Sequence, residues 1–158
     1  MRIEHPIPPL FDENSRILIL GSFPSEASRR AAFFYSHPQN RFWRVLAGLY
    51  GEKTPESTGE KRAFALSRGI ALWDVIASCE IRGSADASVR DAVPNDLSPI
   101  LRGSRVERIF TNGRLAHTLY GRFQEKETGI GAIYLPSTSP AYAAFTLEKL
   151  IEQWKVIL

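Results

Sequence analysis

Cysteine is almost absent from the sequence, because Cys79 is the only one in 158 residues. A lone thiol rules out an intrachain disulfide, a cysteine-rich zinc site and a four-cysteine iron–sulfur cluster. Histidine is nearly as scarce, and His5, His37 and His117 have no helical spacing between any two of them. Such a set does not predict a metal centre. We therefore expect a buried or incidental thiol, no metal ligands and no cofactor.

Long apolar runs are also missing. No stretch approaches the roughly 18 apolar residues of a membrane span, and the first residues (MRIEHPIPPLFDENS) lack the basic-then-apolar layout of a signal peptide. We therefore expect a cytoplasmic protein without a membrane partner. No repeat, low-complexity tract or linker interrupts residues 1–158, and this length suits one domain with one core.

The charge is only weakly one-sided. The chain has 20 Lys and Arg against 17 Asp and Glu, which gives a net charge of +3 at pH 7. This excess permits a polyanionic partner such as DNA, but a solvated basic face with no such partner explains it equally well.

Four short apolar runs predict buried strands. They alternate with helical segments, a pattern typical of a parallel sheet that is covered on both faces. We therefore predict an α/β fold, a single-domain three-layer α/β/α sandwich around a central four-stranded parallel sheet. The expected strands are residues 16–21, 69–76, 105–112 and 132–135, and the polar residues 77–95 are expected to form a loop.

Capping residues predict where helices begin and end. Asn40 is a candidate N-cap, and Ser57 with Glu60 forms a capping box. Gly51 and Gly69 are expected to end these two helices. Further helices are expected from residue 98, after residue 113 and at the C-terminus.

The loops with unusual chemistry follow the predicted strands. Ligands of parallel sheets bind beyond the carboxyl ends of the strands, so we expect one crevice to collect these loops. The first, GSFPS, has no lysine, and G-x-S-x-G is absent from the chain, which argues against nucleotide hydrolases and serine hydrolases. The loops are residues 21–25 with their continuation 33–40, residues 73–82 and residues 135–140.

Residues 33–43 (FFYSHPQNRFW) place five aromatic side chains around a polar break. Most of these rings are expected in the core, whereas Tyr35, beside the break, is the candidate for an exposed ring that stacks on a planar base. Asn40 has two interpretations. It caps a helix or a turn, or its amide, with one acceptor and two donor hydrogens, grips a water or a base edge.

Four motifs in this order resemble the uracil-DNA glycosylase superfamily, above all its hypoxanthine-DNA (deoxyinosine) glycosylase branch: GSFPSEAS, YSHPQNRFW, GIALWDVIASCEIRGSADASV and LPSTSPAY. HPxNRFW is also similar to the mismatch-specific uracil glycosylases. Most members carry Asp or Asn where this chain has Phe23, and the hypoxanthine branch has an apolar residue there. The resemblance implies that Asn40 is the catalytic amide, that Tyr35 stacks on a flipped base, and that the loop LPSTSPA pinches DNA, with backbone N–H groups of residues 137–139 holding phosphates.

The resemblance further implies a monomeric, monofunctional enzyme that needs no cofactor and acts on DNA containing deaminated bases, hypoxanthine first. Base contacts are implied for Tyr35, Phe23, Trp73 and Asp74, although Trp73 also suits an ordinary buried aromatic and Asp74 a loop cap. Three alternatives stay open: a mismatch-specific uracil or thymine glycosylase, a DNA-binding module without catalysis, and an enzyme of small nucleosides. The residues expected to contact DNA are Ser22, Ser25, His37, Arg41, Ser137, Thr138 and Ser139.

Overall fold

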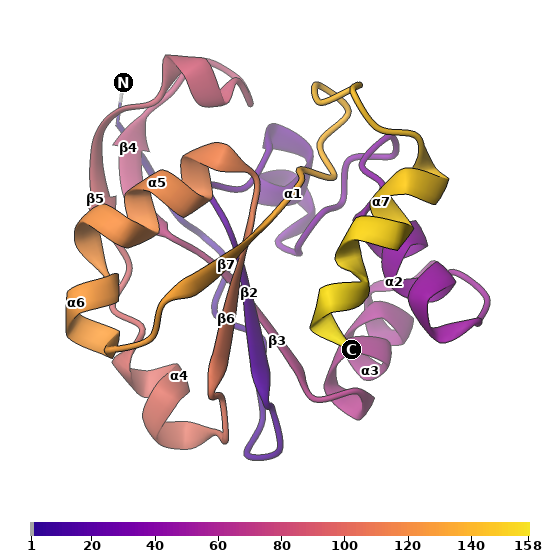
Figure 1. The fold of residues 1–158 in the computed structure, drawn as a ribbon. Helices are drawn as coiled ribbons and strands as arrows, with labels where there is room; N and C mark the ends of the chain where they lie inside the picture. Colours follow the sequence, from indigo (N-terminus) through magenta and orange to yellow (C-terminus); the bar gives the residue numbers. More distant parts are fainter. Residues whose placement is uncertain (1) are drawn as a thin grey trace.

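A four-stranded parallel sheet forms the centre of the computed structural model, which describes residues 2–158 (Figure 1). Its strands are β2 (Ile17–Gly21), β3 (Ile70–Asp74), β6 (Arg108–Asn112) and β7 (Ala132–Leu135). They lie in the order β3-β2-β6-β7, and each neighbouring pair is parallel. The predicted strands and their arrangement are therefore confirmed, with small differences at the ends.

Helices cover both faces of the sheet, as predicted. In Figure 1, α2 (Phe42–Tyr50), α3 (Thr58–Ser67) and α7 (Leu147–Trp154) lie on one side, and α4 (Ser98–Gly103), α5 (Arg114–Phe123) and α6 (Glu125–Thr128) on the other. A hydrophobic core lies on each face of the sheet, and the side chains of β2 alternate between the two. Ile17 and Ile19 belong to one core, and Leu18 and Leu20 belong to the other. The whole strand is apolar because both of its faces are buried.

Most expected helix boundaries also hold, but the prediction of Asn40 as an N-cap is wrong, because the N-cap residue of α2 is Arg41. α3 begins with the predicted capping box, in which Glu60 N–H donates to Ser57 Oγ at 3.0 Å and Ser57 N–H donates to Glu60 Oε1 at 3.1 Å. Gly51 ends α2 with a φ of 63°, a left-handed conformation that costs a glycine little.

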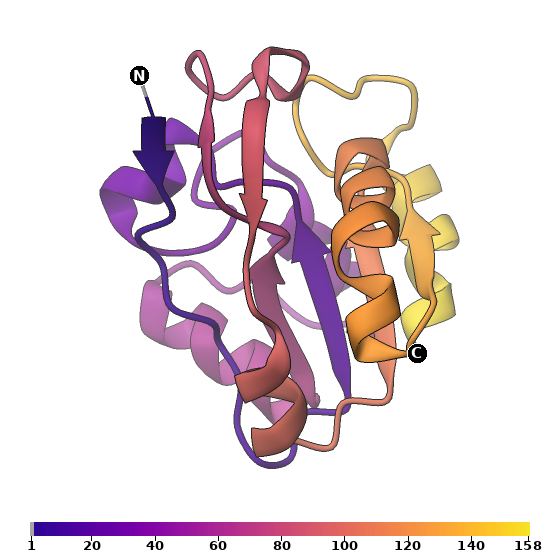
Figure 2. The ribbon, with the colours of Figure 1, turned by 90° about the vertical axis from the view of Figure 1, so that its left-hand side faces the viewer.

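The prediction of a loop over residues 77–95 is wrong. β4 (Ile76–Glu80) pairs antiparallel with β1 (Arg2–Glu4) and β5 (Arg90–Pro94), and the three form a separate sheet (Figure 2). A 3-10 turn, η1 (Asp86–Ser88), lies between β4 and β5. The side chains of β5 are all exposed or half-buried, and its pairing with β4 contains register shifts. Neither an apolar run nor a clean alternation marks such a strand.

Two further short elements lie where no helix was predicted. α1 (Glu26–Ala31) begins within the expected loop GSFPSEAS, and Ser25 caps it by accepting a hydrogen bond from Ser28 N–H. η2 (Lys155–Ile157) follows α7. None of the described helices is long and apolar enough to cross a membrane.

Candidate functional site

A pocket of about 820 Å³ opens at the carboxyl ends of the parallel strands. The last residues of β2, β3 and β6, which are Gly21, Asp74 and Asn112, all contribute to its wall. The predicted loops therefore meet in one crevice, as expected. Of the predicted site residues, Trp73 and Arg41 do not line the pocket, whereas the lining includes Ser22, Phe23, Ser25, Tyr35, His37, Asn40, Asp74, Ser137, Thr138 and Ser139.

Asn40 makes a local hydrogen bond at the start of α2, although Arg41 and not Asn40 is the N-cap residue of that helix. Asn40 Oδ1 accepts a hydrogen bond from Phe42 N–H at 2.9 Å, which ties the side chain to the first turn of α2. The residue is half-buried and lines the pocket, and Nδ2 has no hydrogen-bond partner within residues 2–158. The amide thus supports the helix with its oxygen and has two N–H donors left for a ligand.

Tyr35 is half-buried and not exposed as expected. Its ring stacks on Phe42 with a centroid distance of 4.0 Å and an interplanar angle of 14°, so one ring face is covered. The hydroxyl oxygen is buried without a hydrogen-bond partner among the described residues. The pKa of this phenol lies well above its usual range, mainly because of burial and to a smaller extent because of the nearby charge of Asp74. The adjacent Asn112 side chain offsets part of the rise.

Asp74 is almost completely buried in the pocket wall. Its Oδ2 lies 2.7 Å from His5 Nε2, and this hydrogen bond joins the N-terminal segment to the end of β3. The ring of His5 also packs edge-to-face against Phe23 and Trp73, while Trp73 donates its indole N–H to the Ile7 carbonyl. From the sequence, His5 was considered only as a metal ligand, and this contact was not predicted because no spacing rule connects residue 5 to residue 74.

A second carboxylate reaches the pocket from the connection between β4 and β5. Asp86 lines the pocket, and its Oδ1 accepts a hydrogen bond from Ser22 Oγ at 2.9 Å. Partial burial raises the pKa of Asp86, the Ser22 hydrogen bond opposes the rise, and the charge of Asp74 adds to it. Asp86 belongs to the segment predicted to be a loop and was not predicted as a site residue.

Asn112, at the end of β6, holds the Ser/Pro loop after β7 by two hydrogen bonds. Asn112 donates from Nδ2 to Thr138 Oγ1 at 3.0 Å and accepts from Thr138 N–H at 3.1 Å. Ser139 N–H donates to Ser137 Oγ. Two of the three backbone N–H groups that were expected to hold phosphates are therefore already bonded inside the protein, which leaves hydroxyl groups and Ser137 N–H for that task.

Arg41 fastens the same loop to the start of α2. Its backbone N–H donates to Thr138 O at 3.1 Å, and its guanidinium donates to Tyr142 O at 2.7 Å and Phe145 O at 2.5 Å. The side chain predicted to contact DNA thus binds backbone carbonyls of its own chain.

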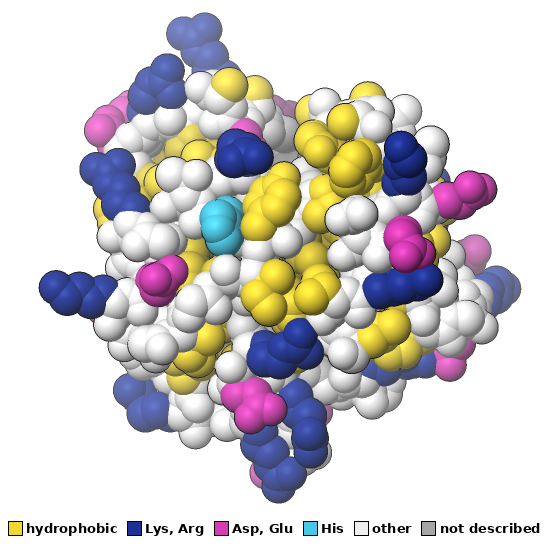
Figure 3. Space-filling model, viewed as in Figure 1, with side chains coloured by type: hydrophobic (Ala, Val, Ile, Leu, Met, Phe, Trp, Pro, Cys, Tyr) yellow, Lys and Arg dark blue, Asp and Glu magenta, His cyan; other side chains and the backbone are white. Residues whose placement is uncertain are grey.

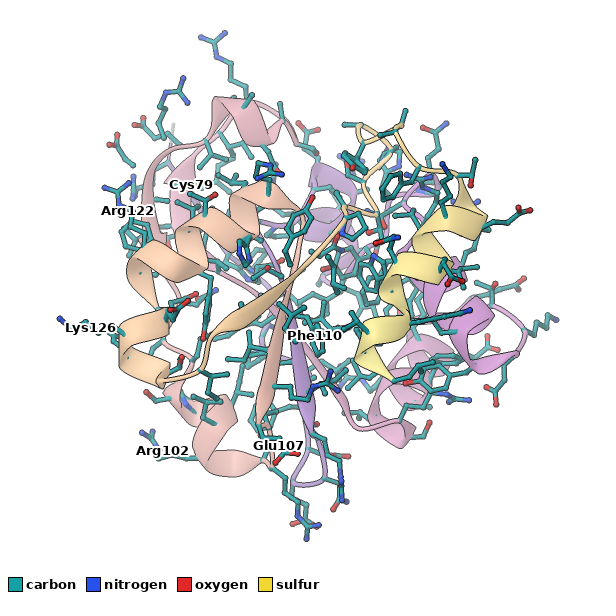
Figure 4. All side chains as sticks on the ribbon, viewed as in Figure 1. Cys79, Arg102, Glu107, Phe110, Arg122 and Lys126 are labelled. Carbon is teal, nitrogen blue, oxygen red and sulfur yellow. The ribbon has the colours of Figure 1, made fainter. Side chains whose placement is uncertain are left out.

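Positive side chains do not gather in one patch on the face of the molecule seen in Figure 3. Figure 3 shows Lys and Arg side chains dispersed across the face that it presents, and Arg102, Arg122 and Lys126 point outward from α4, α5 and α6 in Figure 4. At the pocket itself, Arg114 is part of the wall and Arg29 lies 5.6 Å from the centre of the Phe23 ring. Within residues 2–158 no cluster of His, Cys, Asp and Glu has the composition of a metal site.

Comparisons with known proteins agree with this architecture. The sequence model of the family described as the uracil DNA glycosylase superfamily matches residues 8–157. Among curated proteins, the hypoxanthine DNA glycosylase of Methanosarcina acetivorans is 34% identical in an alignment 159 positions long that covers 98% of each chain. The protein of the same name from Methanosarcina barkeri is 41% identical over 92 residues, 58% of either chain. A solution NMR structure of a candidate uracil DNA glycosylase from M. acetivorans superposes with a TM-score of 0.81, at 30% identity and 99% coverage of both chains.

Proposed function

The chain belongs to the uracil DNA glycosylase superfamily, and from this premise we propose that it is a DNA glycosylase that hydrolyses the N-glycosidic bond of hypoxanthine in DNA. The observation that carries the proposal is the meeting of the Asn40 amide, the Tyr35 ring and the Ser/Pro loop in one pocket. A base inside a duplex is out of reach of such a pocket, so the nucleotide must first be flipped out, at a cost of a few kcal/mol.

The Ser/Pro loop and the pocket wall receive the flipped nucleotide. One face of the Tyr35 ring packs against Phe42, and the base stacks against the other face. Hydroxyl groups of Ser137 and Ser139 bind the neighbouring phosphates. The pocket is complete within one chain, and a single copy acts on the DNA.

Asn40 is the residue that acts on the reacting atoms. Water attacks C1′ of the deoxyribose and releases a proton, the bond from C1′ to the base nitrogen breaks, and the base leaves with the bonding electron pair and takes up a proton from the solvent. An amide does not remove a proton near neutral pH, so Asn40 works by position: Nδ2–H donates to the departing base, and the second lone pair of Oδ1 orients the water. Phe23, which stands where many relatives have an acid or amide, cannot hold that water.

A duplex panel tests the proposal and separates it from the alternatives. Duplexes that contain hypoxanthine, uracil or xanthine opposite each of the four bases are incubated with the protein in EDTA, and abasic sites are measured by alkaline cleavage. We expect hypoxanthine to be released fastest and unmodified duplex to stay intact. Faster release of uracil opposite G would favour the mismatch-specific alternative, and tight binding without release of any base would contradict catalysis.

A further inference from the structure

The hydrogen bond between His5 and Asp74 has a defined direction. His5 Nδ1 accepts from Ile7 N–H at 3.2 Å, so the proton of the neutral ring lies on Nε2, which donates to Asp74 Oδ2 at 2.7 Å. The two side chains are only 3% and 5% exposed. A doubly protonated ring would direct a second N–H at the N–H of Ile7, so this geometry fits one tautomer only.

The surroundings hold the His5 ring in place. Its backbone N–H donates to Ala77 O at 2.7 Å, and its ring lies edge-to-face with Phe23 at 5.9 Å and with Trp73 at 6.0 Å. Trp73 in turn donates its indole N–H to Ile7 O at 2.9 Å. Contacts on all these sides fix the donor atom of His5 relative to β3 and the pocket.

The other oxygen of Asp74 has no such partner. Oδ1 makes no hydrogen bond within residues 2–158, and it lies so close to the end of β2 that a Cβ at Gly21 would be 2.4 Å from it. Asp74 and Gly21 both line the pocket. A carboxylate oxygen in the pocket wall that has no protein donor can accept from a donor that arrives with the ligand.

We propose that His5 is a positioning residue for base recognition, which turns Asp74 so that Oδ1 accepts the ring N–H of the flipped base. This inference rests on the proposed function. Deamination of adenine converts N1 from an acceptor into an N–H donor, and Oδ1 therefore accepts from hypoxanthine but repels the N1 lone pair of adenine. The His5 donor also withdraws part of the carboxylate charge, which would otherwise oppose the negative charge that the departing base acquires.

Two substitutions of His5 separate its hydrogen bond from its packing. His5→Phe keeps a ring between Phe23 and Trp73 but has no donor, whereas His5→Gln places an amide N–H near the position of Nε2. In single-turnover excision of hypoxanthine we expect His5→Phe to slow the rate by about tenfold to a hundredfold, less than loss of a group that touches the transition state, and His5→Gln to recover most of it. The control is His117→Phe, because His117 hydrogen-bonds Thr111 outside the pocket lining, and its rate should not change.

Coupling to Asp74 provides a result that a purely structural role would not give. In an Asp74→Asn background the second change, His5→Phe, should slow excision less than about threefold, because its partner is already altered. The inference is overturned if His5→Phe melts like the wild type and excises hypoxanthine at the wild-type rate, or if the two changes multiply independently. In both of these cases the proposed function stands, since it depends only on the wild type releasing hypoxanthine.

The tautomer can be measured without activity, which keeps the inference testable if His5→Phe fails to fold. Long-range ¹H–¹⁵N spectra of the wild-type protein should show a protonated Nε2 and an unprotonated Nδ1 for His5. A proton on Nδ1 would contradict the hydrogen-bond direction on which the positioning role depends.

Discussion

The two ends of the Asn40 side chain can be tested separately, because they do different work. Oδ1 accepts the Phe42 N–H and supports the start of α2, while Nδ2 is left for the ligand. Asn40→Ala removes both functions. Asn40→Ser removes the amide donors but keeps an oxygen that can accept the same backbone N–H in a turn of similar shape.

The two functions of the Asn40 side chain predict different losses of stability and of rate. Loss of the hydrogen bond to Phe42 N–H costs about 1 kcal/mol, and in a domain of this length that lowers the melting temperature by about 2–4 °C. Loss of a preorganised donor at the departing base costs about two to three orders of magnitude in rate. We therefore expect Asn40→Ala to lose both rate and melting temperature, and Asn40→Ser to lose the rate with little change in melting temperature.

Single-turnover excision of hypoxanthine and thermal melts on the same protein samples measure both quantities. Duplex binding should change little in either variant, because Asn40 is assigned to the chemical step and not to the phosphates. If Asn40→Ser releases hypoxanthine at nearly the wild-type rate, the amide has a structural role only, and the catalytic assignment is wrong.

Three further predictions concern the pocket wall. Tyr35→Phe should melt at the same or a higher temperature than the wild type, because it removes a buried hydroxyl that has no partner within residues 2–158; a drop of several degrees in calorimetry would reveal a bond to that hydroxyl. The raised pKa of Asp86 means that its protonated form suits the folded state, and that this contribution to stability is lost as the pH rises through that pKa. Because asparagine stays neutral, Asp86→Asn should be more stable than the wild type at pH 7. The two melting curves should converge below the ordinary Asp pKa of 3.8, and curves that differ equally at every pH would refute this cause. Borohydride should trap no covalent protein–DNA adduct, because no lysine lines the described pocket, and recovery of an adduct would exclude simple hydrolysis.

The central sheet was predictable because its strands are buried on both faces. A segment such as β2, with all five of its residues buried, must be apolar throughout, and that run is visible in the sequence. β5 was not predictable for the opposite reason. It lies at the edge of a small antiparallel sheet with its side chains at least partly in water, so its residues (RDAVP) carry no strand pattern.

The site was predictable where its residues follow strands or belong to a motif, as for Asn40 and Asp74. It was not predictable where the contact joins distant segments that carry no shared pattern. His5 reaches Asp74 through the pairing of β1 with β4, and Asp86 reaches Ser22 across 64 positions of sequence. Such contacts follow from the tertiary fold, which spacing along the chain does not encode.

The attachment of Arg41 to backbone carbonyls bears on which changes this loop can accept. The guanidinium binds the main-chain oxygens of Tyr142 and Phe145, which every amino acid supplies, and so it places no demand on the side chains at those positions. Residues around the mouth of the pocket can therefore be exchanged while the course of the loop and the placement of Asn40 beside it are preserved. A library randomised at residue 142 should accordingly contain many folded members with altered preferences for the surrounding DNA, which makes this loop a favourable starting point for directed evolution.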